Sequence, residues 1–242
     1  MNSIPSKLTI VVPAKNEARL LPNLLESLCN QDYPFLPAVK VFVADAGSTD
    51  GTPGLALSFR SRLDVEVIPG GLPSVGRNSG ARRSSTPYVL FLDADMELKD
   101  PTLLRRAMDL IERRKLHCVT TNIWCSNGTL RDHVLYLGNN IAQYGSVMVR
   151  PFSTGMFMLF ERSVFQKLGG FHEQALYAED YLLSKKVSNR RFGIVSGCIH
   201  TTNRRFRNMG HFKIIGLFLK TMLNTWNDDY FLHDQGYWHQ KI

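Results

Sequence analysis

The chain has 242 residues, a length that predicts one large domain or one domain with an appendage. Hydrophobic residues make up 44% of it and charged residues 21%, which excludes disordered, collagen-like and disulfide-scaffold proteins. Lys and Arg number 29 against 21 Asp and Glu, so the net charge is +8. This charge favours an anionic partner: a nucleic acid, an acidic lipid or a phosphorylated small molecule.

The cysteines and the termini predict a cytoplasmic protein that could also lie on the inner face of the cell membrane. No two cysteines have the C-x2-C spacing of zinc or redox sites, which indicates free thiols. The seven residues before Leu8 resemble neither a signal peptide nor a transit peptide. Near the C-terminus the longest apolar run, Ile214 to Leu219, is far shorter than the roughly 20 residues of a membrane span.

The first half of the chain alternates predicted strands and helices. Four short runs rich in Val, Ile, Leu and Phe have the composition of buried strands: Leu8 to Val12, Val39 to Ala44, Val65 to Ile68, and Tyr88 to Leu92. Helices are expected between and after them, from Leu20 to Leu28, from Ser74 to Ser85 and from Pro101 to Arg114. This alternation predicts a parallel sheet whose ligands bind at the carboxyl ends of the strands.

The second half is less regular. Strands are predicted over Cys118 to Trp124, Met156 to Phe160 and Ile194 to Thr201, the last interrupted at Gly197. Helices are predicted over Ser163 to Leu168 and Ala178 to Ser188. No repeat or linker divides the chain, so we expect one α/β domain over residues 1–203 and a helical tail over 204–242.

Polar residues follow the strands of the first half. Asp93 and Asp95 end the fourth strand and project to the same face, where their oxygens suit Mg²⁺ or Mn²⁺ and a bound phosphate. Alternatively, they only cap the following helix. The Asp45 to Gly51 segment could likewise be turn chemistry alone. Arg77, near a helix start, could contact a diphosphate or lie on a solvated face.

Together, seven stretches resemble the inverting family 2 glycosyltransferases, which have the GT-A fold and use a nucleotide-diphosphate sugar as donor. The stretches are TIVVPAKNE, VFVADAGSTDGT, GRNSGA, YVLFLDADMEL, STGMFMLFERSVFQKLGGFHE, AED and CIH, in this order between Leu8 and His200. The resemblance implies a Rossmann-like, mostly parallel sheet flanked by helices, a UDP- or GDP-linked donor, and Mn²⁺ or Mg²⁺ as cofactor.

The resemblance also assigns roles to particular residues. It implies a nucleoside pocket lined by Pro13, Ala14, Asn16, Glu17 and Asp45. It further implies a metal and diphosphate motif at Asp93 and Asp95, a glycine near the acceptor at Gly155, Asp180 as catalytic base beside Glu179, and His200 as a third metal ligand. From the residues alone, Glu179 and Asp180 could only complement a helix dipole, and His200 could be a packing residue.

The predicted function is therefore metal-assisted, inverting transfer of a sugar to an acceptor hydroxyl. A sugar nucleotidyltransferase of related fold is the nearest alternative, but its G-G-x-G-T-R motif is replaced here by Pro13-Ala14-Lys15-Asn16-Glu17. A basic nucleic-acid-binding module is a second alternative, disfavoured by the absence of a helix-turn-helix or RNP-like pattern. The arginines at 204, 205 and 207 could bind the diphosphate or an acidic acceptor. Alternatively, they are a run of solvent-exposed charges without a ligand.

Apolar residues in the tail recur at helical spacing: Phe212, Ile215, Leu219, Met222, Leu223 and Trp226. Ile214, Leu217 and Phe218 widen this face, and Lys213 and Lys220 flank it. Such a basic helix suits a membrane interface, so we expect peripheral membrane association and a lipid-linked acceptor. Packing on the domain or on a second subunit is the alternative.

Overall fold

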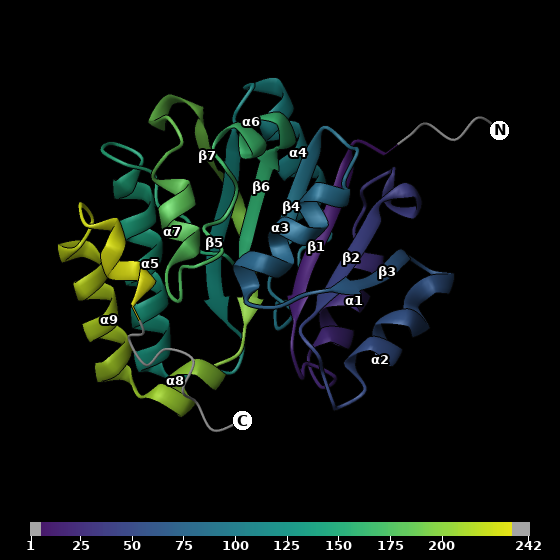
Figure 1. Ribbon diagram of the computed structural model, residues 1–242, viewed down its shortest axis with the longest axis horizontal. Coiled ribbons are helices and arrows are strands. Elements are labelled where there is room, and N and C mark those ends of the chain that lie inside the picture. The colour runs from purple at the N-terminus through teal and green to yellow at the C-terminus, as the bar shows by residue number, and fades with distance from the viewer. Residues whose placement is uncertain (1–5, 234–242) are drawn as a thin grey trace.

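The computed structural model describes residues 6–233, and its centre is a mixed sheet with helices on both faces (Figure 1). The strands are β1 (Leu8–Ala14), β2 (Lys40–Asp45), β3 (Asp64–Pro69), β4 (Tyr88–Leu92), β5 (Cys118–Cys125), β6 (Phe157–Glu161) and β7 (Phe192–Thr201). Their order is β3-β2-β1-β4-β6-β5-β7, and only β6 runs antiparallel to its neighbours. The predicted strands and the mostly parallel sheet are therefore confirmed.

Close packing of helix on strand explains the small residues of the first half. Helices α1 (Leu21–Cys29), α2 (Thr52–Ser58), α3 (Pro73–Arg83) and α4 (Leu103–Arg113) connect the parallel strands. A Cβ atom at Gly80 of α3 would lie 2.4 Å from a methyl carbon of Val11, and one at Gly76 would lie 3.1 Å from the Ala44 Cβ. These glycines let α3 lie directly on β1 and β2, which brings its polar residues to the carboxyl edge of the sheet.

The core lies in two layers because strand side chains alternate between the faces. On one face Ile10 and Val12 pack with residues of α1, α2 and α4, and on the other Val11 packs with residues of α3 and α6 (Arg162–Lys167). In the second layer the rings of Phe91, Phe165 and Phe171 meet at centroid distances of 5.0 to 5.6 Å. This aromatic cluster lies beneath the candidate site.

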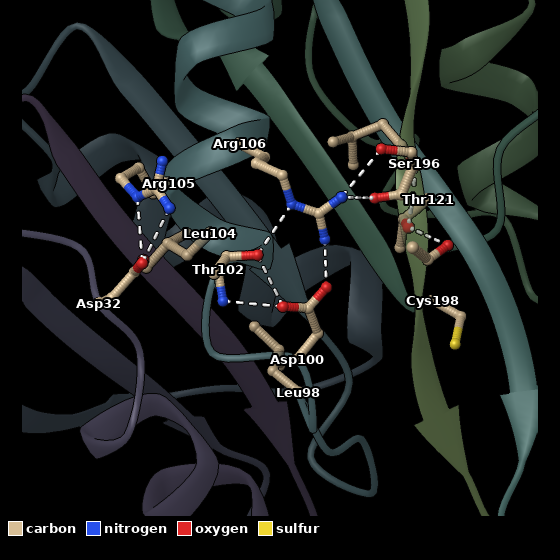
Figure 2. Close-up of polar contacts among 12 residues, drawn as sticks. Asp32, Leu98, Asp100, Thr102, Leu104, Arg105, Arg106, Thr121, Ser196 and Cys198 are labelled. Carbon is tan, nitrogen blue, oxygen red and sulfur yellow. Dashed lines mark hydrogen bonds and ion pairs between the residues drawn. The ribbon is translucent and has the colours of Figure 1, made fainter.

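The predicted interruption at Gly197 is a bulge in β7. The register passes from Thr121 opposite Val195 to Asn122 opposite Cys198, and Gly197 has a φ of 114°. Figure 2 shows what holds it: Arg106 of α4 reaches from the carboxylate of Asp100 to the carbonyl and hydroxyl of Ser196. The bulge adds two residues to β7, so Val195 before it and Ile199 after it pack in the same core layer.

Three helices differ from the sequence predictions. Helix α2, between β2 and β3, was not predicted. The helix expected over Ala178 to Ser188 is the shorter α7 (Glu179–Ser184), because Ala178 has a left-handed φ of 53° and the chain turns after Ser184. Helix α5 (Leu130–Ser146) was not predicted. It begins with a capping box in which Thr129 and Asp132 bond to each other's backbone N–H.

The tail forms α8 (Arg204–Met209) and α9 (His211–Leu223), which confirms the predicted helix up to Leu223, although Trp226 lies beyond its end. Phe206 is buried against Tyr136, and Thr221 donates a hydrogen bond to the Tyr177 hydroxyl at 2.8 Å. The last part of the predicted tail, residues 234–242, lies outside the described residues. Between residues 6 and 233, no helix is long and apolar enough to span a membrane.

Candidate active site

The loops after β1 and β2 are joined to each other by hydrogen bonds. The Asn16 N–H donates to the Ser48 hydroxyl at 2.8 Å, and the Thr49 N–H donates back to the Asn16 carboxamide oxygen at 2.9 Å. The Glu17 N–H donates to the Thr52 hydroxyl at 2.9 Å. Asn16 has a left-handed φ of 54°, a conformation that asparagine tolerates better than most residues. The predicted nucleoside residues of these loops therefore lie in one rigid pair of turns.

Pro13 and Ala14 end β1 directly beside Ala44 and Asp45 of β2, so the structure brings these predicted residues together. One carboxylate oxygen of Asp45 accepts the N–H groups of Gly47 and Ser48 at 3.1 and 3.0 Å. The other, Oδ1, is buried and has no hydrogen-bond partner among residues 6–233. A buried unpaired acceptor is unfavourable, and a donor group on a ligand would satisfy it.

Arg77 joins the DxD segment to the predicted catalytic helix. Its side chain is only 3% exposed and donates to Asp93 Oδ1 at 2.5 Å and to Glu179 Oε1 at 2.6 Å. Burial alone would lower the pKa of Arg77, but the charges of Asp93, Glu179 and Asp180 outweigh it and raise that pKa. Because the guanidinium is enclosed by these partners, it serves as their counterion, and the predicted diphosphate contact stays a prediction.

Gly155 and Asp180 are in direct contact. The Gly155 N–H donates to Asp180 Oδ2 at 2.5 Å, and the Tyr181 N–H donates to Oδ1 at 2.7 Å. A Cβ atom at residue 155 would lie 2.5 Å from Arg77 Nη2, so a larger residue here would displace the guanidinium that Asp93 and Glu179 bind. The structure thus brings together Gly155, Asp93 and the adjacent Glu179 and Asp180, which come from three separate motifs of the sequence.

The pKa of Asp180 is raised to about 7. Burial is the largest cause and the negative charge of Glu179 adds to it, while Arg77 and the two backbone hydrogen bonds oppose it. A carboxyl with a pKa near neutrality can both hold and release a proton at physiological pH, as general-base catalysis requires. Its two backbone bonds fix the orientation of the group.

A second cluster of charges lies near residues that were predicted to bind the nucleotide. Arg204, the first residue of α8, contacts Glu17 at 2.6 Å and Asp95 at 3.2 Å. Burial and the neighbouring Asp93 raise the pKa of Asp95, whereas Arg204 lowers it. Burial likewise raises the pKa of Glu17, and Asp95 contributes. Three carboxylates are therefore close enough to repel one another, and Arg204 partly neutralises two of them.

These carboxylates fit a divalent cation. Hard oxygen donors suit Mg²⁺ and Mn²⁺, and added positive charge would relieve the repulsion that raises the pKa of Asp95. Asp95 and Asp93 would hold the ion, as the DxD motif predicts. Among residues 6–233, however, no three His, Cys, Asp or Glu side chains are arranged as a ready-made metal centre.

The ring of His200 contacts residues other than this pair of aspartates. Its Nδ1 is 3.2 Å from the Ser126 hydroxyl and its Nε2 is 3.5 Å from the Cys198 sulfur. Its backbone pairs with that of Glu97, two residues beyond Asp95. Both ring nitrogens thus face other partners, and the role of third metal ligand stays a prediction.

Sequence reasoning missed the residues that support the site from below. Asn78 donates to the Phe171 carbonyl at 2.8 Å and accepts the Phe171 N–H at 3.0 Å, which holds the ring of Phe171 5.2 Å from the Arg77 guanidinium. Asn78 stands next to Arg77 in the GRNSGA stretch, but nothing local in the sequence indicates its partner 93 residues away.

The comparisons with known proteins agree with this geometry. A model of glycosyl transferase family 2 matches residues 9–169, about two thirds of the chain. The chain belongs to this family. The poly(ribitol-phosphate) β-N-acetylglucosaminyltransferase TarS of Staphylococcus aureus is 32% identical over 101 residues, which are 40% of this chain and 18% of that protein. The glycosyltransferase AglE of Haloferax volcanii is 23% identical over 82% of this chain and 68% of its own length.

Solved structures show the same fold. The mannosyltransferase PcManGT of Pyrobaculum calidifontis, in complex with GDP-Man and Mn²⁺, matches with a TM-score of 0.68 and 21% identity over 91% of this chain and 65% of that one. TarS in complex with UDP-GlcNAc matches with a TM-score of 0.67 and 20% identity over 82% of this chain and 59% of that one. The predicted GT-A fold is thus confirmed. The sequence match covers only 18% of TarS and the structural match 40% of it, so the substrates of this protein are a separate question.

Proposed function

We propose that this chain is an inverting glycosyltransferase that moves a sugar from a UDP- or GDP-linked donor to an acceptor hydroxyl. The single observation that carries the proposal is the linked set Asp93, Arg77, Glu179 and Asp180, which connects the DxD segment to a carboxyl of raised pKa. The nucleotide-sugar complexes of the two solved relatives support the donor class.

Different residues of the chain would bind the donor and transfer the proton. The joined loops around Asn16 and Asp45 would bind the nucleoside, with Asp45 Oδ1 accepting a hydrogen bond from it. Asp180 would take the proton of the acceptor hydroxyl, and the Gly155 N–H holds the carboxylate in place for this step. Attack from the face opposite the leaving diphosphate would invert the anomeric carbon.

A divalent cation, Mn²⁺ or Mg²⁺, would be held by Asp95 and Asp93, with His200 as a proposed additional ligand. When bound, it would supply charge stabilisation for the departing nucleoside diphosphate. The mannosyltransferase structure with Mn²⁺ supports a metal of this kind. Arg204 now contacts Asp95 and would have to move for the ion to bind there.

Titration calorimetry with UDP and GDP, each with and without Mn²⁺, tests the proposal. We expect binding that requires the metal, and an Asp95→Asn variant should lose about tenfold or more in nucleotide affinity, about 1.4 kcal/mol. An Asp64→Asn variant is the matched control, because Asp64 pairs with Lys40 at the far end of β3. Metal-dependent binding that is unchanged in Asp95→Asn would contradict the metal assignment.

We further infer that the acceptor is lipid-linked and that the chain is a peripheral membrane protein. Phe152, close to Gly155 in the chain, contacts Tyr181 of α7 at 6.3 Å and Phe218 of α9 at 6.0 Å between ring centroids. The acceptor side of the site therefore adjoins the apolar tail helix. Transfer assays with lipid-linked and with free sugar acceptors would separate the two acceptor classes.

A further inference from the structure

Helix α5 exposes a stripe of apolar residues to solvent, while its protein-facing side combines Leu135 and Tyr136, which pack on the core, with polar residues that bond to β5. Asn140 accepts the Ile123 N–H at 3.0 Å and donates to the Ile123 carbonyl at 3.0 Å, and the buried Gln143 donates to the Thr121 carbonyl at 3.1 Å. The opposite side exposes a stripe of apolar residues at helical spacing: Leu130, Val134, Leu137, Ile141 and Tyr144, each at least half exposed. A helix that only covers a sheet shows the reverse arrangement.

Helix α9 exposes a second apolar stripe. Leu217 and Thr221 face the protein and are buried. Phe212, Ile215, Leu219, Met222 and Leu223 remain exposed, Phe212 to 91%. Packing on the domain therefore accounts for one side of α9 only, and the wide apolar face expected from the sequence is present on the other.

The two helices lie side by side at one end of the molecule (Figure 1). Near their first residues, His211 Nε2 of α9 contacts Asp132 Oδ1 of α5 at 2.7 Å. Beyond their last residues, the Arg150 guanidinium lies 4.0 Å from the ring centroid of Trp226. Contacts at both ends mean that α5 and α9 run in the same direction as neighbours.

The exposed charges on these two helices have one sign. Asp132 is the only carboxylate in either α5 or α9, and it is buried and paired with His211. Arg131, Lys213 and Lys220 are exposed on the same two helices. Asp228, which follows α9, is paired with Lys185. On α5 and α9 themselves, the exposed apolar residues are therefore accompanied only by exposed cations, and the exposed carboxylates of Asp228 and Asp229 come after the end of α9. Such an arrangement on the two helices complements an anionic lipid surface.

We propose that the outward faces of α5 and α9 form one docking surface for a membrane rich in anionic lipid. We call it the α5–α9 face and define it by Val134, Leu137, Ile141, Ile215, Leu219 and Met222. Its apolar side chains would enter the interface while the cations contact headgroups, with Tyr144 and Trp226 as interfacial aromatics. The inference deepens the membrane association proposed above, adding α5 and the lipid charge.

A second copy of the chain fits this face less well. In a symmetric dimer the same patch would meet itself, so the cations bordering one copy would face those of the other. Like charges brought together in this way oppose association. Phe152 contacts both α9 and α7, the helix that carries Asp180, so α9 adjoins the acceptor side of the proposed site.

Flotation of the full chain with vesicles tests the proposal. Vesicles of phosphatidylcholine alone would be compared with vesicles containing about one third phosphatidylglycerol at low salt. We expect the protein to float with the anionic vesicles only. Both Leu137→Ser/Ile141→Ser and Ile215→Ser/Leu219→Ser should lower the bound fraction by about tenfold or more, and Arg131→Gln/Lys220→Gln should lower it at the same vesicle composition.

Leu55→Ser is the matched control, because Leu55 is an exposed leucine of α2 at the opposite end of the molecule (Figure 1), and it should float like the wild type. A wild type that stays at the bottom of the gradient, or binding unaffected by either double serine variant, overturns the proposal. So does a dimer in sedimentation equilibrium that both serine variants dissociate, because the face would then bind a second copy. Flotation needs no donor or acceptor, so its outcome is independent of the proposed transfer reaction.

Discussion

At the scale of single residues, the site depends on one buried cation between carboxylates from distant parts of the chain. Arg77 lies in α3, Asp93 follows β4 and Glu179 begins α7, and their contacts bring together segments up to 102 residues apart. The sequence motifs predicted that each of these residues matters. They could not indicate that Arg77 is enclosed by protein groups, because burial depends on the packing of Phe171 and Gly155 around it.

Removing this cation should destabilise the protein. Arg77→Met leaves Asp93 and Glu179 without their shared partner, and breaking a buried pair typically costs about 3–5 kcal/mol. Arg82→Met, in the same helix, is the control, since Arg82 and Glu173 form an exposed pair whose loss should cost less than about 1 kcal/mol. Urea denaturation measures both. Equal losses in the two variants would contradict the role assigned to Arg77.

Asp180 should control the pH dependence of transfer. With its pKa at about 7, the carboxyl is protonated below that pH and cannot accept the acceptor's proton, so kcat/KM should rise with pH to a plateau above neutrality. Asp180→Asn should lower transfer by about 10²–10⁴-fold while nucleotide binding is kept. A rate profile without an ascending limb near pH 7, or a loss of nucleotide binding in the variant, would contradict the assignment.

The Asp180 carboxyl should also make the stability of the protein depend on pH. Its folded pKa lies above the ordinary Asp value, so the native state holds more protons than the unfolded state between the two pKa values. The free energy of unfolding therefore falls as the pH rises through this range. Measured from about pH 5 to about pH 8, the wild type should lose stability relative to Asp180→Asn. A constant difference between the two proteins would show that Asp180 does not titrate there.

At the scale of helices and strands, pattern and structure agree wherever apolar residues face the core. The buried strands and the leucines of α1 follow this rule and were predicted from spacing alone. Helix α5 breaks it, because Asn140 and Gln143 bond to β5 while Leu130 and Leu137 face outward. Its only local signal is the capping box at Thr129 and Asp132, which indicates a helix start but not which side is buried.

The contact between α3 and β1 should tolerate no added carbon. Gly80→Ala would place a Cβ atom 2.4 Å from Val11, and overpacking of this kind costs about 1–3 kcal/mol. A Cβ atom at Gly138 of α5 would have no other atom within 4 Å. Gly138→Ala should therefore stabilise the helix by up to about 1 kcal/mol. Thermal unfolding of the two variants should therefore shift in opposite directions, and a stabilised Gly80→Ala would contradict the close packing.

At the scale of the whole molecule, the C-terminal helices connect the nucleotide side of the site to the α5–α9 face. Arg204 begins α8 and contacts Glu17 and Asp95, while Phe206 in the same helix is buried against Tyr136 of α5. Helix α9 follows directly and meets α5 at His211. A change at Asp95 can thus reach α8 through one side chain, a connection between residues 109 positions apart that spacing in the sequence does not indicate.

This connection predicts that donor binding alters the tail helices. A cation held by Asp95 would compete with Arg204 for the same carboxylate, so α8 would lose its first anchor when GDP or UDP binds with Mn²⁺. Amide hydrogen exchange over residues 204–209 should then become faster, because an opened helix end loses protection. In Arg204→Gln, exchange in this segment should already be fast without ligand and should change little on binding. Arg207→Gln, in the same short helix, is the control and should respond like the wild type. Exchange in α8 that is the same with and without nucleotide and Mn²⁺ in the wild type would show that Arg204 does not couple the two parts of the molecule.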